Sequence, residues 1–141
     1  MLAKAITIAA QAHLGQIDRV GQPYILHPLR AMFRFKTEAE MIVAVLHDVV
    51  EDQPDWDLDR LRQAGFSREI VQAVDHVTRR DEETYEAFVE RTAKNDLARR
   101  VKLADLEDNM DVKRLESLTE QDLDRLARYH RAWLRLSTAD S

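Results

Sequence analysis

The sequence contains no cysteine, only three glycines and three prolines, and no apolar run long enough to cross a membrane. Without cysteine it has no disulfide bond, no thiolate zinc site and no cysteine nucleophile, so a bound metal must use His, Asp or Glu side chains. The N-terminal segment also lacks the apolar core and cleavage site of a signal peptide. We therefore expect a cytoplasmic protein that is neither secreted nor inserted in a membrane.

The size and charge of the chain limit its domain number and its partners. It has 141 residues, of which 45% are hydrophobic, and this is enough for one helical core. Its formal net charge is −5, whereas binding to a nucleic-acid backbone needs an extended basic surface. We expect one domain over residues 1–141 that binds no nucleic acid, while a small phosphorylated molecule needs only a few clustered cations.

The spacing of apolar residues predicts an all-α fold, a single helical bundle. Apolar residues recur every three or four positions, as on one face of a helix, rather than in alternation. Three such stripes lie in residues 2–13, 39–50 and 70–77.

Cap and breaker residues predict where further helices begin and end. The expected helices lie at about 84–94, 96–109 and 120–138, and Asn95 and Thr119 are suitable N-caps for the second and third. Glycine, proline and aspartate predict loops at 15–24 and 53–57, the latter ended by Asp57 as a cap.

Two pairs of residues suggest a metal site. His47 and Asp48 end an apolar helix, and such neighbours can bind one divalent cation, although a dipeptide of this kind is also common at solvated helix ends. His27 precedes Pro28 at the start of another predicted helix.

Asp105 is the most informative residue of the predicted site. It lies between Leu103 and Leu106 on a helix whose apolar faces should be packed. A carboxylate in such a place is costly unless it is paired or bound to metal. A shell of His and carboxylate ligands suits Mn, Fe, Zn or similar ions, and the sequence does not distinguish among them.

Two further acids follow the His-Asp pair. If the helix continues, Glu51 lies one turn beyond His47, and Asp52 one turn beyond Asp48. A bound cation lowers the pKa of its water, and a neighbouring carboxylate can take the proton, which favours attack on phosphorus. The alternative is that these two acids simply end a helix in solvent.

Four motifs, in this order along the chain, resemble the hydrolase domain of the Rel/SpoT family and its free-standing form, the small alarmone hydrolases. They occupy residues 12–16, 21–28, 47–52 and 102–110. The resemblance runs from about Ala3 to about Leu136, which is nearly the whole chain.

The resemblance implies a helical HD domain that removes pyrophosphate from the ribose 3′ position of the alarmones ppGpp and pppGpp. It assigns one Mn²⁺ to four ligands: His27, His47, Asp48 and Asp105. It also implies that Glu51 and Asp52 activate or orient the attacking water.

The resemblance also suggests residues that contact a nucleotide. Asn109 matches a residue that contacts the nucleoside, and Arg125 and Tyr129 match an Arg-x-x-x-Tyr pattern that faces the substrate. An Arg fork binds phosphate oxygens well, although spacing of four is common on any helix surface. Lys102 is a further candidate for phosphate contact, and a solvated basic face explains it equally well.

The chain departs from the family pattern at two positions. Asp18-Arg19 stands where the family usually has Arg-Lys, so either Arg19 stacks on the base or the base is held differently. Val112 replaces a threonine that follows the nucleoside-contacting Asn109. These changes put guanine selectivity in question and leave the metal-centred hydrolysis untouched.

Two further residues that could be mistaken for metal ligands are not assigned as ligands. His13 belongs to the apolar stripe of the first helix and is expected to be a hydrogen-bonded core or helix-end residue rather than a fifth ligand. Asp108, three residues after Asp105, lies on a related helix face but is not assigned as a ligand. The sequence also offers no glycine-rich phosphate loop, and we expect no synthetase domain.

Three functions are compatible with these patterns. The first is a (p)ppGpp 3′-pyrophosphohydrolase, and the second is a phosphohydrolase of another nucleotide, such as NADPH or a 3′-phosphorylated nucleotide. The third is a nucleotide-sensing module without turnover, which is disfavoured because all metal ligands and both water-activating acids are present. The sequence gives no oligomeric state.

Overall fold

The computed structural model describes residues 1–138, and residues 139–141, which end the predicted domain, lie outside this part. In chain order the helices are α1 (Leu2–Ala12), α2 (Leu26–Met32), α3 (Glu38–Leu46), α4 (Val49–Asp52), α5 (Leu58–Gln63), α6 (Arg68–His76), α7 (Tyr85–Ala93), α8 (Asp96–Asn109) and α9 (Glu120–Ser137). The described residues contain no strand beyond one isolated bridge between Ile17 and Pro23. The all-α prediction is confirmed.

Local capping explains why the helices begin where they do. The Asn95 side chain accepts a hydrogen bond from the Ala98 amide at the start of α8. Thr119 and Asp122 form a capping box at the start of α9. The three helices predicted after residue 80 therefore agree with α7, α8 and α9 to within one residue at each end.

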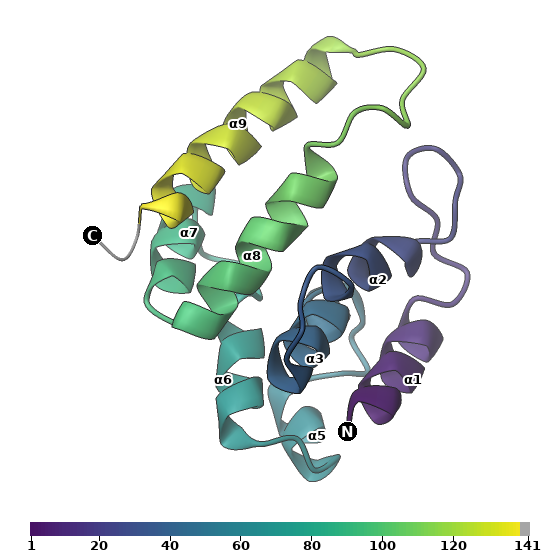
Figure 1. Ribbon diagram of the computed structural model, residues 1–141, viewed down its shortest axis with the longest axis vertical. Helices are drawn as coiled ribbons and strands as arrows, with labels where there is room; N and C mark the ends of the chain where they lie inside the picture. The colour runs from purple at the N-terminus through teal and green to yellow at the C-terminus, as the bar shows by residue number, and fades with distance from the viewer. Residues whose placement is uncertain (139–141) are drawn as a thin grey trace.

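Helix α8 is the central element of the fold (Figure 1), where it contacts α2, α3, α6, α7 and α9. A larger apolar core lies among α1, α2, α3, α5, α6 and α8, and a smaller one among α7, α8 and α9. Because α8 borders both cores, its side chains reach the boundary between the half of the bundle around the larger core and the half around the smaller core. This boundary is where the candidate site lies.

Two loops meet at one end of the molecule, above α2 and beside the start of α9 (Figure 1). The first joins α1 to α2 and contains Gly15 and Gly21, whose φ angles of 82° and 84° favour glycine. The second joins α8 to α9. Their side chains line a common cavity described below.

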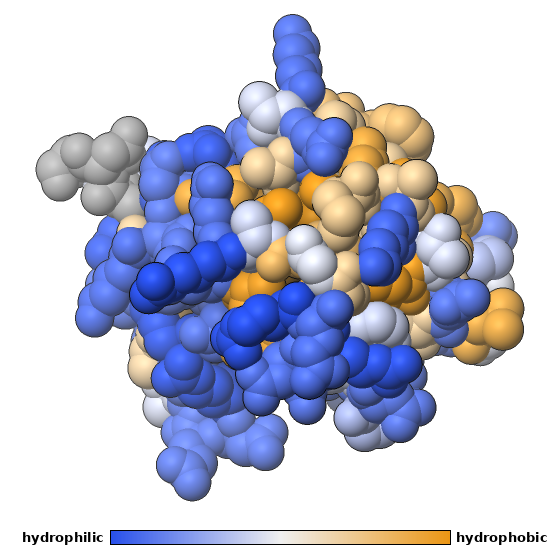
Figure 2. Space-filling model, turned by 90° about the horizontal axis from the view of Figure 1, so that it is seen from below, coloured by the Kyte–Doolittle hydropathy of each residue, from blue (hydrophilic) through white to orange (hydrophobic). Residues whose placement is uncertain are grey.

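The surface is mixed in character. Figure 2 shows the molecule from below, with hydrophilic residues covering one part of this face and apolar residues gathered on another. Among residues 1–138, no helix combines the length and apolar character that a membrane span requires.

Candidate metal centre

Four side chains from different parts of the chain meet at the boundary between the halves. His27 comes from α2, His47 and Asp48 from the turn between α3 and α4, and Asp105 from α8. One possible ligand atom from each lies within 4.8 Å of the others. His27, His47 and Asp105 are buried, with relative exposures of 5%, 3% and 4%. This cluster could hold a metal ion.

His47 and Asp48 lie at a break between two helices, α3 and α4. Helix α3 ends at Leu46 with His47 as its C-cap, as the sequence predicted, and α4 begins at Val49 and contains Glu51 and Asp52. The His47 imidazole Nδ1 lies 2.6 Å from the Ala44 carbonyl oxygen, which the backbone amide of His47 meets only at 3.5 Å. In a continuous helix the Ala44 carbonyl would accept a hydrogen bond from the backbone amide of Asp48, and here it accepts one from the His47 imidazole.

Hydrogen bonds fix which nitrogen of each imidazole faces the cluster. Nδ1 of His47 donates to the Ala44 carbonyl, and Nδ1 of His27 lies 2.6 Å from Oδ2 of Asp108. Both Nε2 atoms then face Asp105, at 2.8 Å from His27 and 3.1 Å from His47. Metal-ligating histidines are commonly oriented in this way through their second nitrogen.

The field of the cluster is negative and stabilises positive charge. Burial lowers the pKa of His27, but hydrogen bonds to Asp105 and Asp108 outweigh it and raise that pKa to about 9. Burial raises the pKa of Asp48, yet the neighbouring His47 lowers it to about 2. The same carboxylates that favour protonated imidazoles would favour a divalent cation at the centre, so the donor set fits a metal.

Asp108 and Arg30 support the centre, and the sequence analysis missed their role. The Asp108 carboxylate is 3% exposed and accepts hydrogen bonds from Arg30 Nε at 2.8 Å and Arg30 Nη2 at 3.1 Å. It also orients His27 from the side opposite Asp105. The signal in the sequence is the spacing of Asp105 and Asp108, which places both carboxylates on related faces of one helix.

Tyr24 and Lys102 bind the two carboxylates of the cluster directly. The Tyr24 hydroxyl donates to Asp48 Oδ2 at 2.5 Å, and Lys102 Nζ lies 2.7 Å from Asp105 Oδ2. Burial lowers the pKa of Lys102, but the Asp105 charge outweighs it and raises that pKa above its usual range. Lys102 was predicted to contact phosphate, and in this structure its ammonium is instead paired with Asp105.

Glu51 and Asp52 flank the centre but have different partners. The Glu51 carboxylate accepts a hydrogen bond from the Arg79 amide at 2.9 Å, and the Asp52 carboxylate accepts one from Gln16 Nε2 at 3.2 Å. Burial raises the pKa of both acids, and the negative charge of Asp48 raises both further. Each is therefore a better proton acceptor than an ordinary surface carboxylate.

A cavity of about 480 Å³ opens beside His27. Four of the five residues predicted to bind substrate line it: Arg19, Asn109, Arg125 and Tyr129. Lys102, Glu51 and Asp52 are not among its lining residues. The cavity therefore borders the metal centre on the His27 side, while the two acids lie elsewhere around it.

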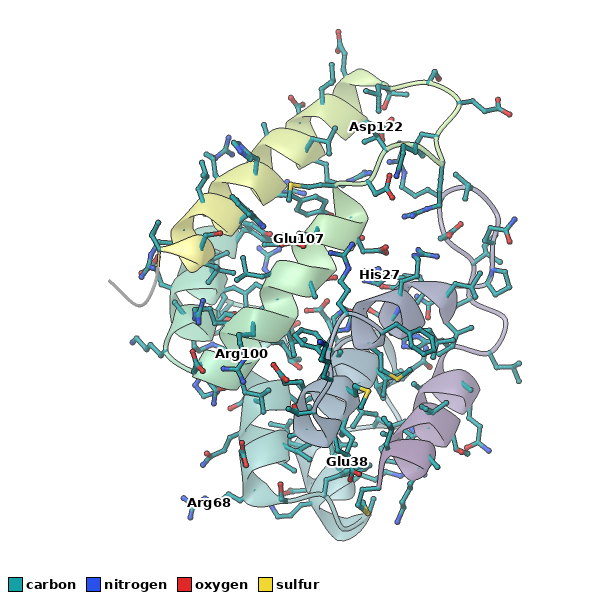
Figure 3. The ribbon with its side chains drawn as sticks, viewed as in Figure 1. His27, Glu38, Arg68, Arg100, Glu107 and Asp122 are labelled. Carbon is teal, nitrogen blue, oxygen red and sulfur yellow. The ribbon has the colours of Figure 1, made fainter. Side chains whose placement is uncertain are left out.

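The lining of the cavity carries a network of charges. Arg19 forms an ion pair with Asp122, which also accepts a long hydrogen bond of 3.5 Å from Arg125. Hydrogen bonding to Arg19 lowers the pKa of Asp122 to about 2. Figure 3 labels Asp122 at the start of α9. The Asp18 carboxylate instead accepts hydrogen bonds within its own loop, from the backbone amides of Val20 and Gln22, each at 2.9 Å.

Asn109 and Val112 lie at the end of α8 and just beyond it. Asn109 lines the cavity and donates through Nδ2 to Asp105 Oδ1 at 3.1 Å, so it connects the cavity to the metal centre. Val112 also lines the cavity, at the place where the family pattern has a threonine.

Comparison with curated proteins gives consistent relatives. No protein-family model matches the chain. It is 36% identical over 119 residues to a guanosine-3′,5′-bis(diphosphate) 3′-pyrophosphohydrolase of Haemophilus influenzae, with 73% of this chain and 17% of the relative covered. It is 32% identical over 100 residues to the bifunctional (p)ppGpp synthase/hydrolase SpoT of Escherichia coli, with 67% and 14% covered. The chain thus spans only 14% to 17% of the length of these relatives.

A solved structure has the same fold. It is described as a metazoan ortholog of SpoT that hydrolyzes ppGpp and plays a role in starvation responses. The TM-score is 0.80 at 24% identity, with 97% of this chain and 85% of the other covered. The fold and the sequence similarity together support a Rel/SpoT-like HD domain in this chain.

Proposed function

We propose that the chain, as one HD domain over residues 1–141, is a metal-dependent phosphohydrolase that removes pyrophosphate from the ribose 3′ position of ppGpp and pppGpp. One observation carries the proposal. Four potential ligand atoms lie within 4.8 Å of one another beside a cavity of about 480 Å³. The names of the relatives, two of which refer to this reaction or this nucleotide, support the choice of substrate.

We propose that His27, His47, Asp48 and Asp105 hold one Mn²⁺. A donor set of two imidazoles and two carboxylates suits this class of cation, and both imidazoles present Nε2 to the centre. When bound, a divalent cation supplies Lewis acidity toward water and phosphate oxygen. Asp108 and the Ala44 carbonyl hold the imidazoles in the orientation that ligation needs.

Glu51 and Asp52 are proposed as the groups that receive and direct the proton of the attacking water. Their pKa values are raised by burial and by the charge of Asp48, which increases their basicity near neutral pH. Each carboxylate also keeps oxygen lone pairs free, since Glu51 accepts one hydrogen bond from Arg79 and Asp52 one from Gln16.

The cavity is proposed to bind the nucleotide. Arg125 and Arg19 offer guanidinium groups for phosphate oxygens, while the Tyr129 ring offers a surface for the base or ribose. Asn109 lies between the cavity and Asp105 and would bring the ribose 3′ side toward the centre.

A second candidate substrate class is a different nucleotide with a phosphate to be removed. Asp18 has no guanidinium or aromatic group on which guanine could stack, and its carboxylate accepts hydrogen bonds from two backbone amides of its own loop. Val112 presents no hydroxyl to the cavity. These two departures favour a cavity with weaker selection for guanine.

A nucleotide panel with product identification tests both. With Mn²⁺ and ppGpp we expect GDP and pyrophosphate, and no turnover without a divalent cation. Metal-loaded protein that leaves ppGpp intact would reject the first substrate class. Faster turnover of NADPH or of a 3′-phosphorylated nucleotide would establish the second.

A further inference from the structure

His13 is a buried polar residue that the proposed reaction does not use directly. It caps the C-terminal end of α1 and is 2% exposed, within a stripe of otherwise apolar residues. Its Nε2 atom is buried and has no hydrogen-bond partner among the described residues. A buried polar atom without a partner costs about 1–3 kcal/mol, so packing alone favours an apolar residue at this position.

The other nitrogen of His13 begins a chain of hydrogen bonds that reaches Asp52. Nδ1 of His13 lies 2.9 Å from Oε1 of Gln16, and Nε2 of Gln16 lies 3.2 Å from Oδ2 of Asp52. Among the described residues, Gln16 is the one hydrogen-bond partner of the Asp52 carboxylate. The position of that carboxylate therefore depends on the orientation of the Gln16 amide.

The directions of these hydrogen bonds follow from donor and acceptor chemistry. A carboxylate only accepts, so the NH₂ end of Gln16 must face Asp52 and its carbonyl oxygen must face His13. Two acceptors cannot share a hydrogen bond, so His13 carries its proton on Nδ1 and donates to Gln16. Without this donor the Gln16 amide could rotate and present its oxygen to Asp52, which would repel the carboxylate.

We propose that His13 is a positioning residue that acts through Gln16 to hold the Asp52 carboxylate in place beside the metal centre. Backbone hydrogen bonds support the arrangement. The backbone N–H of Gln16 donates to the His13 carbonyl at 3.0 Å, and the backbone N–H of Tyr24 donates to the Gln16 carbonyl at 2.8 Å. The Tyr24 ring also contacts the His13 ring, with centroids 5.0 Å apart. The inference rests on the proposed function, since it takes Asp52 to act on the attacking water.

The kinetic test compares His13→Leu with His13→Asn, whose side-chain amide restores an N–H donor. We expect His13→Leu to lower kcat for ppGpp about 10- to 100-fold, with KM and Mn²⁺ content unchanged, and His13→Asn to recover most of the loss. Gln16→Met, at a half-buried position, should give the same loss and serves if His13→Leu does not fold. His130→Leu, the same change at an exposed helix position, is the matched control and should keep wild-type kcat.

The effect of His13 must also pass through Asp52. In an Asp52→Asn background, His13→Leu should cause no further loss of kcat, because the group that it positions is already gone. An equal loss of kcat in both backgrounds would overturn the proposal, as would a loss that His13→Asn does not recover.

A measurement without turnover separates this proposal from the proposed function. Nitrogen-15 NMR of the wild-type protein should show the proton of His13 on Nδ1, and Asp52→Asn should shift the side-chain amide signal of Gln16. A proton on Nε2, or a Gln16 signal indifferent to Asp52→Asn, would overturn the positioning role even in an active enzyme. If no nucleotide is turned over, the proposed function fails, and the NMR result alone decides whether the hydrogen-bonded chain exists.

Discussion

The metal centre and the adjoining cavity are built in different ways. In the centre, Asp105 is 4% exposed and is bound by His27, His47, Lys102 and Asn109. In the cavity, the Arg19 side chain is 51% exposed and has an ion pair to Asp122. Buried, mutually bonded groups tolerate little change, whereas an exposed loop can change without loss of the fold. We therefore expect that the proposed hydrolysis and the selection of the nucleotide can be changed separately by mutation.

The largest effect is expected from removing a carboxylate of the centre. Asp105→Ala leaves two imidazoles and a lysine without their shared partner, so we expect loss of bound metal and of all measurable turnover. Elemental analysis and an activity assay check this directly. Unchanged metal content in Asp105→Ala would break the comparison, because the centre would then not depend on its most enclosed residue.

Glu51→Gln should separate metal binding from proton transfer. The amide keeps the size of the side chain but cannot take a proton, so we expect kcat to fall about 10²- to 10⁴-fold while Mn²⁺ content stays unchanged. Measurements of kcat and metal content on the same preparation check this. Wild-type kcat in the variant would show that Glu51 only ends a helix.

Asp108→Asn should have an intermediate effect through His27. If the new amide donates toward Nδ1, the imidazole proton moves to Nε2, the atom that faces the centre. We expect metal affinity or activity to fall about 10- to 100-fold, as for other groups that orient metal ligands. Titration with Mn²⁺ measures this, and unchanged affinity together with unchanged activity would contradict the supporting role of Asp108.

Changes in the cavity should be smaller and should affect binding. Arg19→Ala removes an exposed guanidinium, and we expect KM for ppGpp to rise about fivefold with kcat within about twofold of wild type. Arg62→Ala, an exposed arginine on α5 paired with Asp59, is the matched control. A large loss of kcat in Arg19→Ala would erase the distinction between the two regions.

The smallest effect is expected outside both regions, in the loop before α7. Hydrogen bonds from Arg91 lower the pKa of Glu83 from 4.5 to about 2. A carboxyl with a depressed pKa in the folded protein stabilises it above its unfolded pKa, and the contribution is lost as pH falls toward 2. Glu83→Gln should therefore cost about 1 kcal/mol of unfolding free energy at pH 7, and less near pH 2–3.

Denaturant unfolding at several pH values measures this cost. The same change at the exposed neighbour Glu82 is the control and should be close to neutral at every pH. A cost of Glu83→Gln that grows as pH falls would contradict the sign of the pKa shift.

The fold followed from the sequence because its signals are local. Asn95 and Thr119 are caps whose hydrogen bonds lie within three residues, and these positions were predicted correctly. The end of α3 at His47 was also predicted, but the restart of the chain as α4 at Val49 was not, because the apolar spacing runs on to Val50. The hydrogen bond between the His47 imidazole and the Ala44 carbonyl lies at this break. The spacing of apolar residues gives no information about a side-chain hydrogen bond of this kind.

Residues of the site could be predicted only where the type of residue and its neighbours in the sequence already indicate an unusual environment. A carboxylate at position 105 between two leucines signals an unusual burial, whereas nothing in the sequence pairs Asp108 with Arg30 or Tyr24 with Asp48. Those contacts join residues far apart along the chain. The first depends on the packing of α2 against α8, and the second on the position of the α1–α2 loop beside the turn between α3 and α4. The ligand roles of His27, His47, Asp48 and Asp105 stay predictions.

The most direct test of the central claim is an anomalous difference map from crystals of this protein grown with Mn²⁺, with data collected at the manganese absorption edge. We predict a single peak per chain within bonding distance of His27, His47, Asp48 and Asp105. A peak bound elsewhere, or none between these four side chains in crystals saturated with Mn²⁺, would contradict the account.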